Sequence, residues 1–235
     1  MATHLDLQEQ EQVDQLKAFW QQYGNLITWT LTLVLAGFAA WNGWNWWQRE
    51  QGSKAGAMFD ELDRAAQGND AEKSARVFAD LKERFPRTAY AEQGALLAAK
   101  VQAEKGQADA ALTTLAWASE NAGEDEVRII ARLRAAGLLL DKKQFDAALA
   151  QLDAAAQTKN ASEFEALIAD RRGDVLLAQG KAADARKAFE AAYKLLDAKL
   201  DYRQIIDAKL TALGAAPAAT AAATAASAAA SGAAK

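Results

Sequence analysis

The sequence of 235 residues lacks cysteine altogether and contains one histidine and two prolines. Without cysteine the chain forms no disulfide, offers no thiolate nucleophile and provides no Cys-ligated zinc or iron–sulfur site. The single histidine, His4, stands beside the N-terminus, which argues against a Ser-His-Asp site and against a histidine-based metal site. Because Pro86 and Pro217 are the only prolines, the chain is predicted to be nearly all helical.

The charged residues show no excess of one sign that would indicate a charged partner. Lys and Arg number 27, Asp and Glu number 31, and the net charge is −4. This balance does not favour contacts with phosphates, so no nucleic-acid partner is predicted. Acid–base pairs such as Glu72/Arg76 and Asp80/Arg84 are spaced to support exposed helix surface. No carboxylate pair stands in a glycine loop or beside a histidine. The chain is therefore predicted to be no enzyme, with no catalytic, cofactor-binding or metal-ligating residues.

An uncharged segment with aromatic ends lies in the N-terminal part of the chain. No residue from Ala18 to Gln48 carries a charge. Trp20 and Trp41 are 21 residues apart, roughly 31 Å of helix, which matches a hydrocarbon core of about 30 Å. Indole and phenol rings collect at headgroup depth because one side of each ring is apolar and the other carries a hydrogen-bonding group. The sequence predicts a transmembrane helix over 24–47. The predicted interface anchors are Trp20, Tyr23, Trp41, Trp44, Trp46 and Trp47.

Two alternatives compete with the membrane anchor. A core helix of a soluble domain would not normally bracket its apolar run with aromatics at bilayer spacing. A cleaved signal peptide fits poorly, because the preceding segment is acidic and no A-x-A cleavage pattern follows. Residues 1–23 are thus predicted to remain attached as a short segment. The flanking charges, Lys17 against Arg49 and Lys54, differ by one residue and leave the orientation open.

The region after the anchor contains a repeat of 37 residues. GQADAALTTLAWA begins at Gly106, KQFDAALAQLDAA at Lys143 and GKAADARKAFEAA at Gly180. The pattern of a small residue, a large apolar residue four positions later and a small residue three positions after that resembles the tetratricopeptide repeat. The recurring residues are Ala111, Ala148 and Ala185, then Leu115, Leu152 and Phe189, then Ala118, Ala155 and Ala192. An alanine-rich bundle with accidental self-similarity is the alternative.

The repeat predicts an all-α fold in which the transmembrane helix precedes an α-solenoid over 52–213. Four helix pairs are expected near 53–86, 87–123, 124–160 and 161–197, with a capping helix over 200–213. Gly173 is predicted at a close helix approach, and Gly180 at a turn. Residues 214–235 form an Ala-, Thr- and Ser-rich tail without large apolar residues, so a disordered tail is expected there.

Stacked helix pairs form a superhelix whose concave face accommodates extended or helical peptide segments. The first helices of the second, third and fourth pairs would supply the residues of that groove. The alternative is that these residues belong to the interior packing or to solvated helix surface. The candidate groove residues are Leu96, Lys100, Leu133, Leu140, Asp174 and Leu177.

Three stretches together resemble one known family. They are EQEQVDQLKAFWQQYGNLITW (Glu9–Trp29), the tryptophan-rich exit of the anchor and RGDVLLAQG (Arg172–Gly180). In this combination the chain resembles the YfgM-type family, the ancillary subunits of the bacterial SecYEG translocon. The resemblance implies a single-pass protein of the inner membrane whose residues 1–23 are cytoplasmic and whose repeats are periplasmic. It also implies association with SecYEG and with a membrane-anchored periplasmic prolyl isomerase of chaperone type.

Under this resemblance the repeats would bind partner proteins or emerging, unfolded polypeptides and would link translocation to periplasmic chaperones. A second function stays open on the residues alone: a non-catalytic scaffold that organises another envelope complex, for cell-wall or outer-membrane assembly. Neither function requires a cofactor.

Overall fold

A computed structural model describes residues 7–197 and 201–214. These residues are helical, with no strand among them, which confirms the all-α prediction. Residues 215–235 of the predicted tail (214–235) and His4 lie outside the described residues. The helices, with one short 3₁₀ turn η1, are α1 (Leu7–Gln67), α2 (Ala71–Arg84), α3 (Ala89–Glu104), α4 (Ala108–Asn121), α5 (Asp125–Asp141), α6 (Phe145–Ala156), η1 (Ala161–Phe164), α7 (Glu165–Ala178), α8 (Ala182–Leu195) and α9 (Asp201–Ala212).

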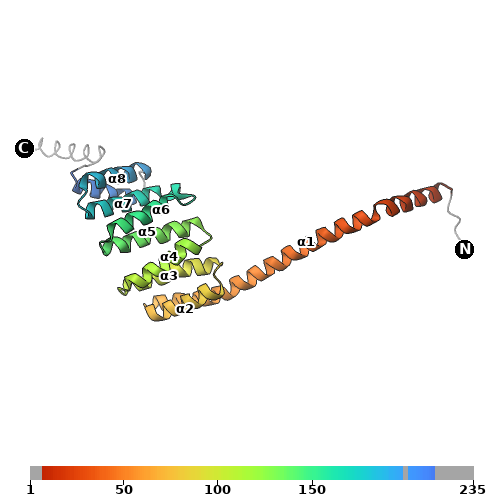
Figure 1. Ribbon diagram of the computed structural model, residues 1–235, viewed down its shortest axis with the longest axis horizontal. Helices are drawn as coiled ribbons and strands as arrows, with labels where there is room; N and C mark the ends of the chain where they lie inside the picture. Colours follow the sequence, from red (N-terminus) through yellow and green to blue (C-terminus); the bar gives the residue numbers. More distant parts are fainter. Residues whose placement is uncertain (1–6, 198–200, 215–235) are drawn as a thin grey trace, which may run out of the picture. The chain divides into compact units, whose positions relative to one another are not determined.

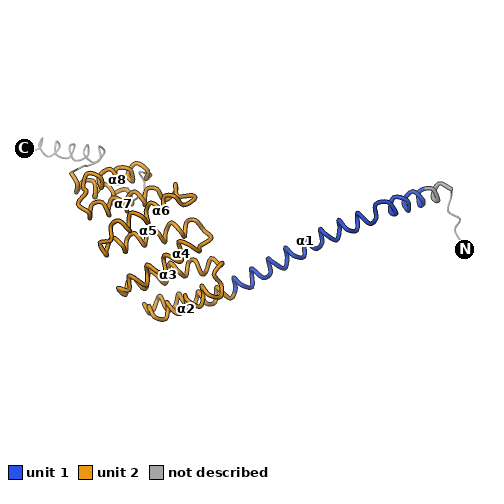
Figure 2. The backbone as a smooth tube through the Cα atoms, viewed as in Figure 1, with its two compact units in different colours: residues 1–53 blue, residues 54–235 orange. Residues whose placement is uncertain are grey.

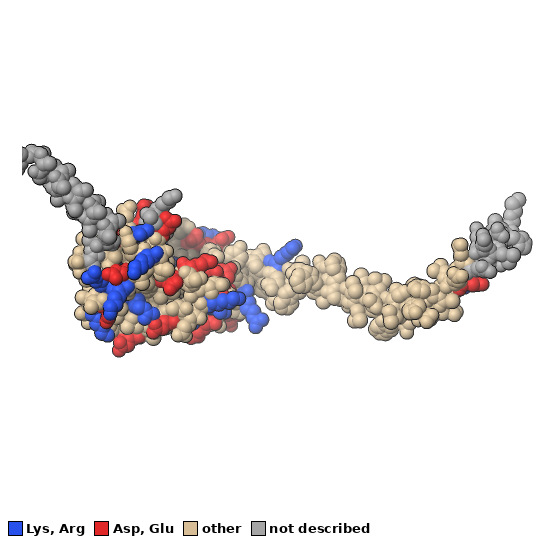
Figure 3. Space-filling model, turned by 90° about the horizontal axis from the view of Figure 1, so that it is seen from above, with Lys and Arg blue, Asp and Glu red and all other residues tan. Residues whose placement is uncertain are grey.

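The chain divides into two units, residues 1–53 and 54–235 (Figure 2). The described part of the first unit is a single stretch of helix α1, in which no residue from Ala18 to Gln48 carries a charge (Figure 3). Its large apolar side chains are exposed; Leu33, for example, is 69% exposed. Among the described helices, α1 alone is long and apolar enough to cross a membrane. Such a surface is unfavourable in water and favourable in lipid.

The threonine hydroxyls inside this apolar stretch are satisfied within the helix itself. The hydroxyls of Thr28, Thr30 and Thr32 donate to the carbonyls of Gly24, Leu26 and Thr28 at 2.7, 2.8 and 2.8 Å. Thr hydroxyls are expected to bond back by one turn, and in a bilayer this bond replaces the water that is absent. The α1 backbone is therefore compatible with a hydrocarbon environment.

The second unit is a stack of antiparallel helix pairs (Figure 1). The last turns of α1 lie in this unit and precede α2, and the following pairs are α3 with α4, α5 with α6 and α7 with α8. Helix α9 packs on α8 and closes the end of the stack. The predicted four pairs and capping helix are thus confirmed. The helix does not break at Gly52: α1 runs without interruption from the first unit into the second.

Local sequence explains where these helices begin and end. The Asp70 side chain accepts from the Lys73 amide at 2.9 Å and caps α2, and the Thr88 hydroxyl caps α3 in the same way. The turns inside the second, third and fourth pairs each place one residue in the left-handed region, Gly106 at φ 74°, Lys143 at φ 58° and Gly180 at φ 80°. Glycine adopts this conformation without strain, so Lys143 carries the strain of its turn.

The 37-residue pattern forms the core of the stack. Eight of the nine recurring residues are 0% exposed, and Leu115 is 1% exposed. The repeat-equivalent residues of the first pair, Ser74, Phe78 and Leu81, are buried as well. Small residues allow the two helices of a pair to approach, and the large residue between them fills the remaining space.

Gly173 shows how tight this approach is. A Cβ atom at Gly173 would lie less than 3.0 Å from three ring carbons of Phe189, on the facing helix. The structure therefore confirms the predicted close approach. Gly137 on α5 differs from it, because a Cβ atom there would meet no other atom within 4 Å.

The two glycines predict opposite effects of one substitution. Gly173→Ala is expected to lower the free energy of unfolding by about 1–3 kcal/mol, because the added methyl group collides with the buried Phe189 ring. Gly137→Ala is expected to raise it by up to about 1 kcal/mol, because alanine favours helix and the site has room. Urea unfolding of the full chain in detergent, followed by circular dichroism, measures both. Equal effects of the two substitutions would contradict the packing described here.

Candidate partner-binding pocket

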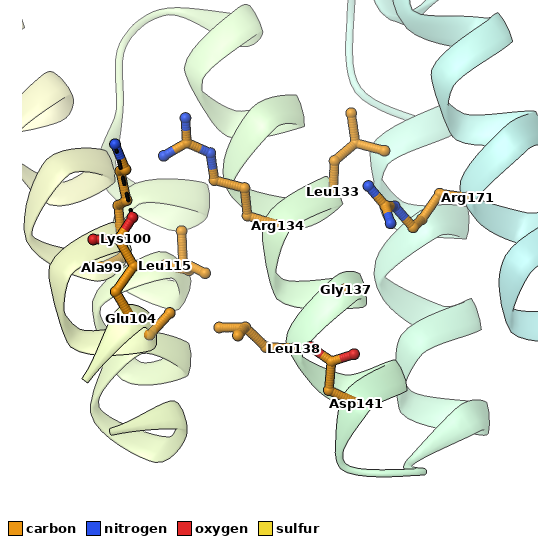
Figure 4. A pocket seen from close by; sticks show the side chains of 11 residues that line it. Ala99, Lys100, Glu104, Leu115, Leu133, Arg134, Gly137, Leu138, Asp141 and Arg171 are labelled. Carbon is orange, nitrogen blue, oxygen red and sulfur yellow. Dashed lines mark ion pairs between the residues drawn. The ribbon is translucent and has the colours of Figure 1, made fainter. Parts of the chain in front are cut away.

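A pocket lies between the second and third helix pairs, with one further residue from α7. Its volume is about 300 Å³. Helix α3 supplies one wall, α5 the opposite wall, and Leu115 on α4 contributes to the floor (Figure 4). The residues that line it are Ala99, Lys100, Ala103, Glu104, Leu115, Leu133, Arg134, Gly137, Leu138, Asp141 and Arg171.

The pocket combines apolar side chains and alanines with charged residues, among which cations predominate. Figure 4 shows the charged groups of Lys100, Arg134 and Arg171 toward one edge, with Asp141 toward the opposite edge. Lys100 Nζ lies 3.8 Å from a carboxylate oxygen of Glu104. Apolar surface supplies most of the favourable free energy when such a pocket binds a peptide, and the charges orient it.

Two of the six predicted groove residues, Lys100 and Leu133, line this pocket. Leu96 and Leu140 are partly buried and pack against the first and second core clusters. Leu177 is 41% exposed near the end of α7. The structure therefore brings Lys100 and Leu133 together and leaves the other four residues outside the pocket lining.

Asp174 is held by the capping helix. Lys209 on α9 donates to carboxylate oxygens of Asp170 and Asp174, each at 2.7 Å, and Asp174 also lies 3.7 Å from Arg171. The Tyr202 hydroxyl donates to Asp170 at 2.5 Å. Burial raises the pKa of Tyr202 above its usual range, and the hydrogen bond to Asp170 raises it further. This polar cluster fastens α9 to α7.

Sequence reasoning missed several residues that shape the site. The carboxylate of Glu92 on α3 is buried and accepts from the amide of Gly123 at 2.8 Å and from that of Glu124 at 3.4 Å. It therefore caps the start of α5 from another helix pair. A 37-residue step leads from Lys100 to Gly137 and from Gly137 to Asp174, so the repeat could have identified Gly137 as a candidate groove residue.

The six predicted membrane-interface aromatics all lie on α1 with exposed side chains, from 43% for Tyr23 to 68% for Trp46. An interface anchor must be exposed on a helix whose surface is compatible with lipid, and these side chains are. In the described ranges, 7–197 and 201–214, no group of His, Cys, Asp and Glu side chains gathers in a way that would hold a metal ion.

Comparison with known proteins decides the family. The tetratricopeptide repeat-like domain family matches residues 17–215. The ancillary SecYEG translocon subunit of Haemophilus influenzae is 30% identical over 186 residues, which cover 79% of this chain and 89% of that protein. The chain belongs to the family of ancillary SecYEG translocon subunits.

Two further members of this translocon-subunit family align over most of their length. The protein of Neisseria gonorrhoeae is 27% identical over 214 residues, which cover 91% of this chain and 100% of that protein. The protein of Escherichia coli is 27% identical over 188 residues, which cover 79% of this chain and 87% of that protein. The match to the repeat-like domain starts within α1 at residue 17, so it includes the whole predicted transmembrane segment (24–47) and the helix pairs.

The polar cluster that fastens α9 to α7 predicts that the folded chain becomes less stable at alkaline pH. Because the pKa of Tyr202 is higher in the folded chain than in the unfolded chain, the stabilisation is complete below about pH 10 and is lost as the pH rises beyond it. Tyr202→Phe should remove that part of the pH dependence. Thermal unfolding between neutral pH and pH of about 11 measures the slope. Identical slopes for the variant and the unchanged chain would refute the proposed linkage.

Proposed function

We propose that the chain acts as an ancillary subunit of the Sec translocon, in which the helix α1 anchors it in the bacterial inner membrane. Support comes from membership in a family whose curated members carry that name and from the single apolar helix near the N-terminus. In this proposal residues 1–23 are cytoplasmic, 24–47 cross the membrane and the repeat domain over 52–213 is periplasmic. The flanking charges, Lys17 against Arg49 and Lys54, favour the opposite orientation by one residue, and the proposal gives the family resemblance more weight.

The proposed role of the repeat domain is to bind segments of other polypeptides. Its partners would be emerging, unfolded chains and a membrane-anchored periplasmic prolyl isomerase of chaperone type, so that translocation is linked to chaperone action. The observation that carries this part is the pocket of about 300 Å³ between α3 and α5, with its apolar floor and charged rim. A pocket of this size and composition suits one or two side chains of a passing segment.

No chemical step belongs to this proposal. Binding that is broad and weak serves a handover between the channel and a chaperone, because a client that dissociates slowly would not be passed on. The open pocket has charges of both signs on its rim and leucines and alanines inside it. The proposed activity is therefore reversible peptide binding.

Leu133→Glu is expected to abolish co-purification of SecYEG subunits or of the periplasmic prolyl isomerase with the full chain. A carboxylate on the pocket wall makes the burial of an apolar partner side chain against it unfavourable. Pull-down from detergent-solubilised membranes, with quantification of the named partners, measures the loss. Leu195→Glu is the matched control, because Leu195 is 50% exposed and does not line the pocket. Undiminished binding by a folded Leu133→Glu variant would remove the pocket from the proposed function.

A photo-crosslinking amino acid at the position of Lys100 separates this function from the scaffold alternative. Lys100 is an exposed residue of the pocket rim, so a replacement there is expected to preserve folding. We expect crosslinks to Sec channel subunits or to chains in transit. Crosslinks confined to cell-wall enzymes or outer-membrane assembly proteins would favour the scaffold.

A separate experiment tests on which side of the membrane the repeat domain lies. Alkaline phosphatase fused after Leu213 folds only where its disulfides form, outside the cytoplasm. We expect an active fusion in cells with an intact inner membrane. An inactive but full-length fusion would place the repeats in the cytoplasm and would exclude periplasmic partners.

A further inference from the structure

Gly137 stands in the interior of α5 and lines the pocket. A glycine inside a helix destabilises it relative to alanine, because the unfolded chain loses more freedom on folding. Such a glycine is usually retained where a neighbour approaches closely, as Phe189 does at Gly173 and Leu81 does at Gly94. At Gly137 a Cβ atom would meet nothing within 4 Å. Packing within the chain therefore gives no reason for glycine at this position.

The repeat also distinguishes Gly137 from the equivalent residues of the neighbouring helix pairs. Lys100 and Asp174 occupy the positions equivalent to Gly137 in the neighbouring units, 37 residues on either side. Both equivalents carry charged side chains, of which Lys100 projects at the pocket rim and Asp174 pairs with Lys209. The third helix pair thus lacks a side chain at the position where the second and fourth pairs each have a long or charged one. The result is a gap in the pocket wall between Leu133 and Leu138.

The charged side chains around this gap favour a ligand group of negative charge. Arg134 donates through Nη1 to the Leu96 carbonyl at 2.9 Å, and its remaining guanidinium N–H groups donate to nothing within the described ranges. A guanidinium has five N–H donors, so most of its capacity is available to a ligand. Lys100 lies at the same edge of the pocket, 3.8 Å from Glu104, and Arg171 lies toward that edge as well, 3.7 Å from Asp174 (Figure 4). This edge complements a carboxylate.

We propose that Gly137 is a socket for one large apolar side chain of a partner segment, and that a carboxylate of the same segment pairs with the edge formed by Lys100, Arg134 and Arg171. The proposal rests on the proposed peptide-binding function and adds the chemistry of the bound segment. The occupant is an acidic–apolar segment of another protein. A large residue enters because the glycine leaves room, and the carboxylate fixes the direction because the opposite edge carries Asp141.

The test uses the full chain in detergent and labelled peptides of about 12 residues, long enough for roughly three helical turns. One peptide carries a central Phe with Glu residues on one side, the second has Ala in place of Phe, and the third has Lys in place of Glu. We expect the first to bind about tenfold more tightly than the second, a difference of about 1.4 kcal/mol. The third is expected to bind more weakly than the first. Fluorescence anisotropy measures all three.

Gly137→Leu is expected to weaken binding of the Phe peptide about tenfold, because the new side chain fills the socket. Its thermal midpoint should stay the same or rise, since leucine is the better helix former. Gly52→Leu is the matched control: Gly52 also lies inside a helix, a Cβ atom there also meets nothing within 4 Å, and it does not line the pocket. The control should bind as the unchanged chain does.

A separate variant tests the charged edge of the pocket. Lys100→Glu should reduce the preference for the Glu peptide over the Lys peptide by about two- to fivefold, the range of a single exposed ion pair. A role of Lys100 in folding alone would leave that preference unchanged.

The outcomes separate this inference from the proposed function. If Gly137→Leu binds the Phe peptide as tightly as the unchanged chain while Leu133→Glu does not bind it, the pocket binds peptides and the socket is refuted. If the unchanged chain binds the Phe and Ala peptides equally, the socket is refuted as well. If light scattering shows that Gly137→Leu converts a dimer to a monomer, a second copy of this chain is the occupant, and the proposed partner is wrong.

Discussion

The close approach of the two helices in each pair is the interaction on which the repeat domain depends. In the second, third and fourth pairs a small residue lies at the crossing, as Gly173 does, and a large apolar residue such as Phe189 fills the space beside it. This contact recurs every 37 residues, and the side chains it uses are almost wholly buried. Each pair alone would expose apolar surface that its neighbours cover in the stack, so the pairs depend on one another for stability. The capping helix is necessary for the same reason, because Ile206 and Leu210 cover the last open face.

Polar residues join one helix pair to the next across this apolar core. Glu92 reaches from α3 to the first amides before α5, and Asp170 on α7 binds both Tyr202 and Lys209 of the cap. Buried carboxylates are unfavourable unless they are well paired, and here each accepts two hydrogen bonds. They fix the angle between neighbouring units more specifically than apolar contacts do. The pocket lies between the second and third helix pairs, which Glu92 joins, so Glu92 supports the proposed binding function from outside the pocket lining.

The helix α1 obeys a different constraint. Between Ala18 and Gln48 no charged residue occurs, and the threonine hydroxyls bond to the helix's own carbonyls. A helix of this kind has no need of neighbours to satisfy its backbone, which allows one span to anchor a whole domain. The same chain therefore contains one segment suited to lipid and one domain stabilised by burial from water, and α1 belongs to both. This division fits the family of ancillary SecYEG translocon subunits to which the chain belongs.

The sequence by itself determined the elements: an uncharged span with aromatic ends, helix pairs with a step of 37 residues, the glycine at the close approach and the final capping helix. These are local or periodic properties, and periodicity is visible in one dimension. Only the tertiary structure decided which residues form the pocket. Lys100 and Leu133 line the pocket, and Leu133 also packs against the second core cluster. Leu96 and Leu140 pack against the cores without lining the pocket, and Asp174 pairs with Lys209 of the cap. The tertiary structure also revealed the role of Glu92 and the open space at Gly137. The physical reason is that a helix repeat predicts which face of each helix points inward, whereas the distance and angle between neighbouring pairs depend on contacts between residues about one repeat apart.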